Sequence, residues 1–166
     1  MQVPMRKKET YRRPRLDPYI TPEKFAELGK KLEKLKTIKQ PREAQEVKRL
    51  ALMGDFSENA GYQLAKGRLR GFNQAILDIE NQLKFAEIIS SDNNNEVIKL
   101  GHLITVEIYN IQKTYRLLGS EETNPTAGII SHNSPLGLAL IDRRVGDIVK
   151  VNLSDKTVEY KIIKIE

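Results

Sequence analysis

The chain has 166 residues, of which 39% are hydrophobic and 30% charged, and it contains no Trp and no Cys. This length fits one ordinary domain or two small ones, and the 6% aromatic content favours two modest cores over one large one. Without Cys there are no disulfides and no thiolate metal site, which indicates a reducing compartment. Two His residues are too few for a histidine-rich metal centre. No apolar segment approaches membrane-spanning length, so we expect a cytoplasmic protein that has no membrane contact.

The net charge of +6 belongs entirely to the first part of the chain. Residues 1–95 contain 19 Lys or Arg and 13 Asp or Glu, whereas residues 96–166 contain nine of each. A basic region of this kind is typical of a nucleic-acid contact. It fits a solvated helical surface with a basic tail equally well.

Residues 1–20 are expected to form a basic flexible arm. The segment carries six Lys or Arg and has no apolar period, so we expect little structure of its own. An extension without a role is the first interpretation of this arm, and contact with a polyanion is the second.

A helix is predicted to begin at Thr21-Pro22-Glu23, where Thr caps the helix, Pro takes the first helical position and Glu complements the helix dipole. Apolar residues then follow at helical spacing: Phe25, Leu28, Leu32 and Leu35. Because Pro41 lacks an N–H group, we expect a kink or a loosened turn there. The apolar stripe resumes in a shifted phase, and Gly54 is placed to end the helix.

The second helix carries the more regular pattern. Its apolar residues are spaced three and four apart without a break: Tyr62, Ala65, Leu69, Phe72, Ile76, Ile79, Leu83 and Ala86. This spacing predicts a coiled-coil seam, and an ordinary core-facing helix is the plainer alternative. If the helices run antiparallel, paired seam positions share a constant sum, and Leu28 with Leu83 and three further pairs sum to 111. Their midpoint predicts the tip of an antiparallel coiled-coil hairpin over residues 21–90, although the sums rise to 112 or 113 towards that tip.

Beyond residue 90 the pattern changes from helix to strand. A run of Ser, Asp and Asn forms a linker. Alternating apolar residues then predict strands over 104–109, 114–118, 148–152 and 158–165. A short helix opens at Ser134-Pro135, again with a cap and a first-turn proline. We therefore expect a small β-rich domain over residues 96–166 and an α+β chain overall.

The predicted tip, Gly54-Asp55-Phe56-Ser57-Glu58-Asn59-Ala60-Gly61-Tyr62, contains two carboxylates three residues apart. Asp55 and Glu58 match a capping box, which satisfies free N–H groups at the start of the second helix. Capping does not explain why the two acids lie at the far end of a rod. Two carboxylates also form a common partial ligand set for Mg²⁺ when phosphate, water or another protein supplies the remaining ligands. The residues alone leave both interpretations open.

Basic residues flank the tip on both helices: Arg42, Lys48, Arg49, Lys66, Arg68 and Arg70. A solvated helix face is the plainer interpretation, and guidance of a phosphate backbone towards the acids is the functional one. Phe56 has no obvious packing partner at the end of a rod, so we expect it to contact another molecule.

The tip resembles the GreA/GreB family of bacterial transcript cleavage factors, whose pattern is Gly-Asp-x-x-Glu-Asn-Ala-x-Tyr. The resemblance covers residues 21–166 and extends to the two long helices and to three later motifs: Ser134-Pro135-Leu136, Ala139-Leu140-Ile141 and Val145-Gly146-Asp147. It implies an N-terminal antiparallel α-helical coiled-coil hairpin with an acidic tip, followed by a β-rich FKBP-like domain that docks on RNA polymerase.

The resemblance also implies an activity. The hairpin would reach through the secondary channel of RNA polymerase, where Asp55 and Glu58 would be the catalytic acids and would help to bind a Mg²⁺ ion shared with the polymerase. The polymerase would then cleave the RNA 3′ end in backtracked complexes. The chain is thus expected to be a monomeric activator of another enzyme rather than an enzyme itself.

Further residues correspond to family sites. The basic patch that holds the nascent RNA 3′ end falls on Lys66, Arg68 and Arg70, and the tip contacts fall on Phe56, Ser57 and Asn59. Gly61 departs from the family, which more often has an acid there, and glycine weakens a helix. Whether the chain is closer to GreA or to GreB stays open.

Three other functions compete with this one. A channel-binding regulator would dock on the polymerase without stimulating cleavage, although it would not need the tip acids. A coiled-coil chaperone or scaffold would bind partners without magnesium. A peptidyl-prolyl isomerase needs an aromatic pocket, but residues 96–166 offer only Tyr109, Tyr115 and Tyr160, and a fold alone does not imply that activity.

Overall fold

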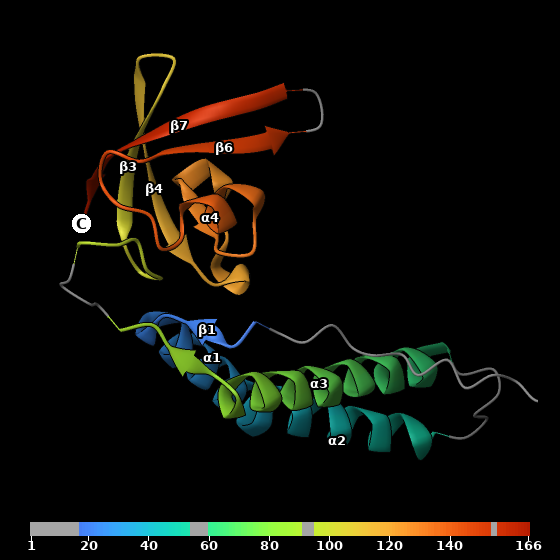
Figure 1. The fold of residues 1–166 in the computed structure, drawn as a ribbon. Helices are drawn as coiled ribbons and strands as arrows, with labels where there is room; N and C mark the ends of the chain where they lie inside the picture. Colours follow the sequence, from blue (N-terminus) through green and yellow to red (C-terminus); the bar gives the residue numbers. More distant parts are fainter. Residues whose placement is uncertain (1–16, 54–59, 91–94, 154–155) are drawn as a thin grey trace, which may run out of the picture.

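The computed structural model describes residues 17–53, 60–90, 95–153 and 156–166. It has two bodies, a long helical hairpin and a C-terminal body built on a curled sheet (Figure 1). The α+β class and the order of these two parts are therefore as the sequence predicts. Within the described residues, no helix is long and apolar enough to cross a membrane.

The hairpin consists of two arms. The elements are α1 (Pro22–Lys34), the π-helix η1 (Leu35–Lys39), α2 (Gln40–Ala51) and, returning, α3 (Ala60–Lys84). Thr21 caps α1 as predicted, because its Oγ1 accepts a hydrogen bond from the Lys24 N–H at 3.2 Å and Pro22 follows it.

The loosened turn expected at Pro41 is present, and it lies immediately before that residue, in η1. The N–H of Gln40 donates to the Leu35 carbonyl, five residues back instead of four. In a regular α-helix the ring of Pro41 would collide with the Thr37 carbonyl, and a widened turn relieves this clash. The turn also adds one residue to the first arm. This extra residue explains why the sum of paired positions rises from 111 to 112 towards the tip.

The buried core of the hairpin lies in the half nearer the C-terminal body. Five buried residues form it: Ile20, Leu28, Leu35, Ile76 and Ile79. Phe25, expected in the seam, is 37% exposed and lies outside this cluster, which Ile20 joins instead. In the other half, α2 has no buried residue, and Ala65 is the buried residue of α3 there.

Two short strands close the base of the hairpin. β1 (Tyr19–Ile20) pairs in parallel with β2 (Glu87–Ile88), and the carbonyl of Ile20 accepts from Ile89 N–H at 2.9 Å. Ile20 is fully buried. Residues 17–20 are thus ordered, unlike the arm expected over 1–20. Burial of the Ile20 side chain stabilises this segment, and a solvent-exposed arm would lack that stabilisation. Residues 1–16 lie outside the described residues.

The C-terminal body is a five-stranded sheet of order β5-β4-β3-β7-β6 with one helix beside it (Figure 1). Its elements are β3 (Leu103–Ile108), β4 (Ile111–Leu118), η2 (Ser120–Glu122), η3 (Pro125–Ala127), β5 (Ile129–Ser131), α4 (Pro135–Leu140), β6 (Ile148–Leu153) and β7 (Lys156–Ile165). Neighbouring strands are antiparallel except β4 and β5, which are parallel. The cap of α4 is the predicted Ser134, whose Oγ accepts from Gly137 N–H at 3.1 Å.

The three aromatic residues of this body do not gather at one site. Tyr160 is buried in the core beneath the sheet, and Tyr115 packs against the same core. Tyr109 is 75% exposed, in the tight turn between β3 and β4. An isomerase pocket lined by these rings is therefore absent from the described part of the chain.

Candidate functional site

The far ends of α2 and α3 define the candidate functional site. Both ends lie at the end of the hairpin opposite β1 (Figure 1). The chain between them holds the sequence-predicted site residues Asp55, Phe56, Ser57, Glu58 and Asn59, which lie outside the described residues. The structure describes the two helices, α2 and α3, that this segment connects.

The predicted basic patch divides between two flanks of α3. Lys66 and Arg70 are four residues apart and therefore share one side of the helix, whereas Arg68 lies on the opposite side of the Ala65 seam. The Lys66 ammonium lies 5.6 Å from the centre of the Tyr62 ring, an arrangement that attracts the cation to the ring face. Helical spacing on α3 thus puts Lys66 and Arg70 on one flank and Arg68 on the other.

Arg68 is engaged across the hairpin. Its Nε donates to Oε1 of Glu43 on α2 at 2.7 Å, with the Arg68 side chain 46% exposed and that of Glu43 14% exposed. The pair ties α2 to α3 in a region that has few buried apolar contacts. The pair uses one of the five N–H donors of the Arg68 guanidinium, and the negative charge of Glu43 partly offsets the charge that Arg68 could present to a phosphate.

A second charged pair lies nearby on α2. Arg49 donates to both carboxylate oxygens of Glu46, from Nε at 2.9 Å and from Nη2 at 2.7 Å. This fork-like pairing, followed by the charges of Arg49, Arg68 and Arg42, lowers the pKa of Glu46. Glu46 is therefore a carboxylate at neutral pH, and it partly offsets the positive charge of this flank.

The sequence matches two family models along most of its length. The model described as "Transcription elongation factor, N-terminal" matches residues 18–88, and "Transcription elongation factor, GreA/GreB, C-term" matches residues 93–166. The transcription elongation factor GreA of Acetivibrio thermocellus is 34% identical over 149 residues, covering 88% of this chain and 94% of that protein. The chain belongs to the GreA/GreB family.

Other members and a solved structure are similar as well. The transcription elongation factor GreA of Macrococcus caseolyticus is 36% identical over 149 residues, which cover 88% of this chain and 94% of that protein. The crystal structure of GreA factor homolog 1 of Thermus thermophilus is 24% identical, covers 86% of this chain and 94% of that one, and aligns with a TM-score of 0.40.

Among the residues that the structure describes, no group of three or more His, Cys, Asp or Glu side chains could hold a metal ion. The donor set at the predicted tip is two carboxylates, a chemistry that suits Mg²⁺ but fills only part of its octahedral shell.

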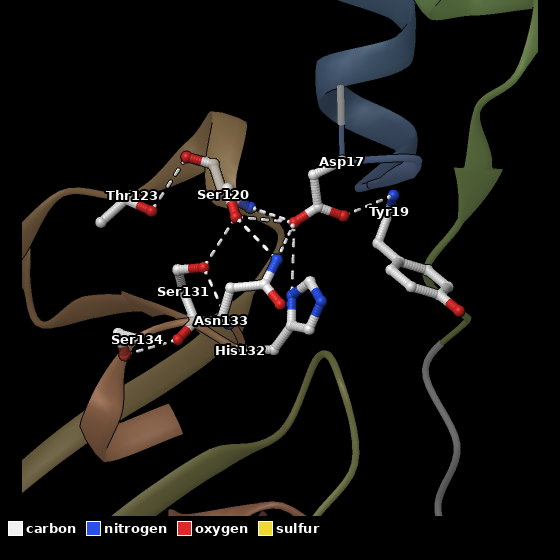
Figure 2. Close-up of polar contacts among 8 residues, drawn as sticks. All are labelled: Asp17, Tyr19, Ser120, Thr123, Ser131, His132, Asn133 and Ser134. Atoms are coloured by element: carbon white, nitrogen blue, oxygen red, sulfur yellow. Dashed lines mark hydrogen bonds and ion pairs between the residues drawn. The ribbon is translucent and has the colours of Figure 1, made fainter. Parts of the chain in front are cut away.

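Sequence reasoning missed a second cluster in this GreA/GreB chain, where the hairpin meets the C-terminal body. Asp17, Ser120, Ser131 and Asn133 form hydrogen bonds there (Figure 2). Asp17 is more than 100 positions away along the chain from the other three residues, which lie on the C-terminal body. No local pattern connects them, so no signal in the sequence alone could have found the cluster.

Proposed function

We propose that this protein binds RNA polymerase through the secondary channel and stimulates its intrinsic cleavage of the RNA 3′ end in backtracked, arrested complexes. It would act as a cytoplasmic monomer that activates another enzyme's nuclease. The observation that carries the proposal is membership of a transcription elongation factor family across both bodies, combined with two carboxylates on the segment that joins the far ends of α2 and α3.

In this mechanism the hairpin carries Asp55 and Glu58 from the surface of the polymerase to its active centre. Its first arm has about 30 residues and is therefore about 45 Å long, which suits passage along a channel towards a buried centre. Asp55 and Glu58 would supply two of the oxygen ligands of a Mg²⁺ ion, and the polymerase would supply the others. When bound, such an ion activates a water molecule and stabilises the leaving oxygen of the phosphodiester.

The basic side chains would hold the displaced RNA. Lys66 and Arg70 share one flank of α3 and can present their charges to consecutive phosphates. Arg68 would add a third positive charge from the other side of the seam, partly offset by its pairing with Glu43. Because these contacts are with the backbone, we expect little dependence on RNA sequence.

The test is RNA 3′-end cleavage in a stalled, backtracked polymerase complex with Mg²⁺. The native protein is compared with Asp55→Asn and Glu58→Gln, which retain size and hydrogen-bonding capacity but remove the charge. Binding to polymerase and far-UV circular dichroism are measured for each variant. We expect strong stimulation by the native protein and a loss of at least about 100-fold in either variant, because each removes charge stabilisation at the reacting centre.

Other results would redirect the assignment. A native protein that binds polymerase but leaves cleavage unchanged would be a channel-binding regulator. A protein that does not bind polymerase would be closer to a chaperone or scaffold, with Asp55 and Glu58 serving only as a helix cap.

A further inference from the structure

Two carboxylates, one on each body, accept hydrogen bonds from the other body. Asp17, on the hairpin side, accepts hydrogen bonds at Oδ2 from the N–H and the Oγ–H of Ser120, both at 2.8 Å (Figure 2). Glu122, on the C-terminal side, accepts from the N–H and the Oγ1–H of Thr21 at 2.8 and 2.6 Å. We call these four residues the clasp.

Within the clasp the Asp17 side chain is buried, whereas Ser120 is exposed, and neighbouring residues support the Asp17 carboxylate. The Asp17 side chain is 4% exposed, and His132 Nδ1 lies 3.4 Å from its Oδ2. Ser131 Oγ donates to Ser120 Oγ at 2.8 Å, since the Ser120 hydroxyl proton is already given to Asp17. Asn133 Nδ2 reaches Asp17 at 3.3 Å. A carboxylate that accepts several hydrogen bonds while buried is held in one orientation.

Backbone fits closely against backbone at the same place. A Cβ atom added to Gly119 would lie 1.9 Å from the Tyr19 carbonyl oxygen. The backbone of Gly119 has φ −66° and ψ 163°, values that any residue adopts. Glycine is thus needed here for the contact between the two bodies and not for the local conformation.

The polypeptide chain connects the two bodies covalently, and the clasp adds a second, non-covalent connection. The covalent path runs from β2 through residues 91–94, whereas the clasp joins residues 101 and 103 positions apart. One connection leaves rotation free, and two separate connections restrict it. Over an arm of about 45 Å, a rotation of 10° at the base moves the far end by about 8 Å. A misplacement of about 1 Å can reduce a catalysed rate about 100-fold.

We propose that the clasp fixes the direction of the hairpin relative to the C-terminal body, so that Asp17 and Glu122 are positioning residues for the tip acids. The inference rests on the proposed function, because it assigns the clasp a part in the same cleavage reaction. The competing explanation is an interface that contributes only to stability.

The first experiment measures hairpin direction without polymerase. Because the chain has no Cys, spin labels can be attached at Gln45→Cys on α2 and Lys113→Cys on β4, both exposed positions. Double electron–electron resonance then gives the distance distribution between them. We expect one narrow distribution for the otherwise native chain and a shifted or broadened one when either Asp17→Asn, which alters the clasp itself, or Gly119→Ala is added. The control is Gly29→Ala, at a helical position with no atom within 4 Å of the added Cβ.

The second experiment compares cleavage with binding. For Gly119→Ala we expect the maximal rate of stimulated RNA cleavage to fall at least about tenfold, while the protein concentration giving half-maximal stimulation changes less than about twofold. A role confined to stability would leave the maximal rate of the folded fraction unchanged. Asp17→Asn is the milder second variant, in case Gly119→Ala does not fold.

Each outcome decides the inference. An unchanged distance distribution in both variants overturns it, and so does a changed distribution with a native maximal rate. If the native protein itself does not stimulate cleavage, the proposed function fails, while the resonance result still shows whether the clasp fixes the hairpin.

Discussion

Near the C-terminal body the two arms of the hairpin meet through buried aliphatic side chains, whereas towards the tip the apolar seam is mostly only partly buried and a charged pair also joins the arms. The first half contains Leu28, Leu35, Ile76 and Ile79 and ends at the clasp. The second half has Ala65 as a buried residue and the Arg68–Glu43 pair. The base is thus suited to fixing the hairpin relative to the C-terminal body, and the far half is suited to presenting charged side chains to a ligand.

The largest expected effect comes from removing apolar volume at the base. Ile76 is 7% exposed within the hairpin core, so Ile76→Ala should lower the free energy of unfolding by about 2–5 kcal/mol. On the same helix but in the far half, Leu64 is 62% exposed, and Leu64→Ala should change it by less than about 0.5 kcal/mol. Urea denaturation followed by circular dichroism measures both. Equal losses would contradict the difference between the two halves.

The next effect is a pH dependence that originates in the clasp. Burial raises the pKa of Asp17, but hydrogen bonds from Ser120 and Tyr19 and the nearby His132 outweigh it and hold the pKa below its usual 3.8. A carboxyl with a lowered folded-state pKa stabilises the fold above its unfolded pKa, and this stability is lost as the pH falls through the folded value.

The measurement is the free energy of unfolding from pH 6 down to acid. The native protein should lose more stability than Asp17→Asn as the pH falls below about 5, and the two should converge at low pH. If the free energies of unfolding of the two proteins changed in parallel with pH, the Asp17 charge would not stabilise the clasp.

A smaller effect of opposite sign is expected from a helical glycine. Gly71 lies inside α3, and a Cβ atom added to it would have no atom within 4 Å. Gly71→Ala should therefore raise the free energy of unfolding by about 0.5–1 kcal/mol, because alanine loses less backbone entropy in a helix. Thermal denaturation measures the change. A lower melting temperature would mean that the far half already has contacts there that a methyl group disrupts.

The smallest effect concerns the charged pair that joins α2 and α3. Glu43→Gln should reduce stability by about 1 kcal/mol or less, and the loss should shrink in high salt. The matched control is Glu159→Gln, whose partner Lys150 is 68% exposed, and which should have almost no effect. A loss of several kcal/mol for Glu43→Gln would show that the far half is held as firmly as the base.

Local and periodic features of the fold could be predicted from the sequence. The caps at Thr21 and Ser134 are signalled by the prolines that follow them. The antiparallel pairing of the arms follows from the constant sum of seam positions, and even its increase near the tip has a cause in the π-helix η1. Each of these signals lies within a few turns of one helix or repeats along it.

Features that depend on distant contacts could not be predicted. Ile20 is buried because β2 returns beside it, and Asp17 is ordered because Ser120 donates to it. β5 has only three residues and no period of its own. At the candidate site, helical spacing separates Arg68 from Lys66 and Arg70, but its pairing with Glu43 required the structure. Asp55 and Glu58 remain a prediction from sequence.

Metal binding by Asp55 and Glu58 is tested by a Mg²⁺ titration of RNA 3′-end cleavage in a backtracked polymerase complex. If the two acids hold the metal, Glu58→Gln should raise the Mg²⁺ concentration for half-maximal stimulation at least about tenfold, since loss even of a group that only supports a ligand weakens metal binding about 10- to 100-fold. High Mg²⁺ should then restore part of the rate. An unchanged half-maximal concentration in both Glu58→Gln and Asp55→Asn would contradict the claim that these acids hold the metal.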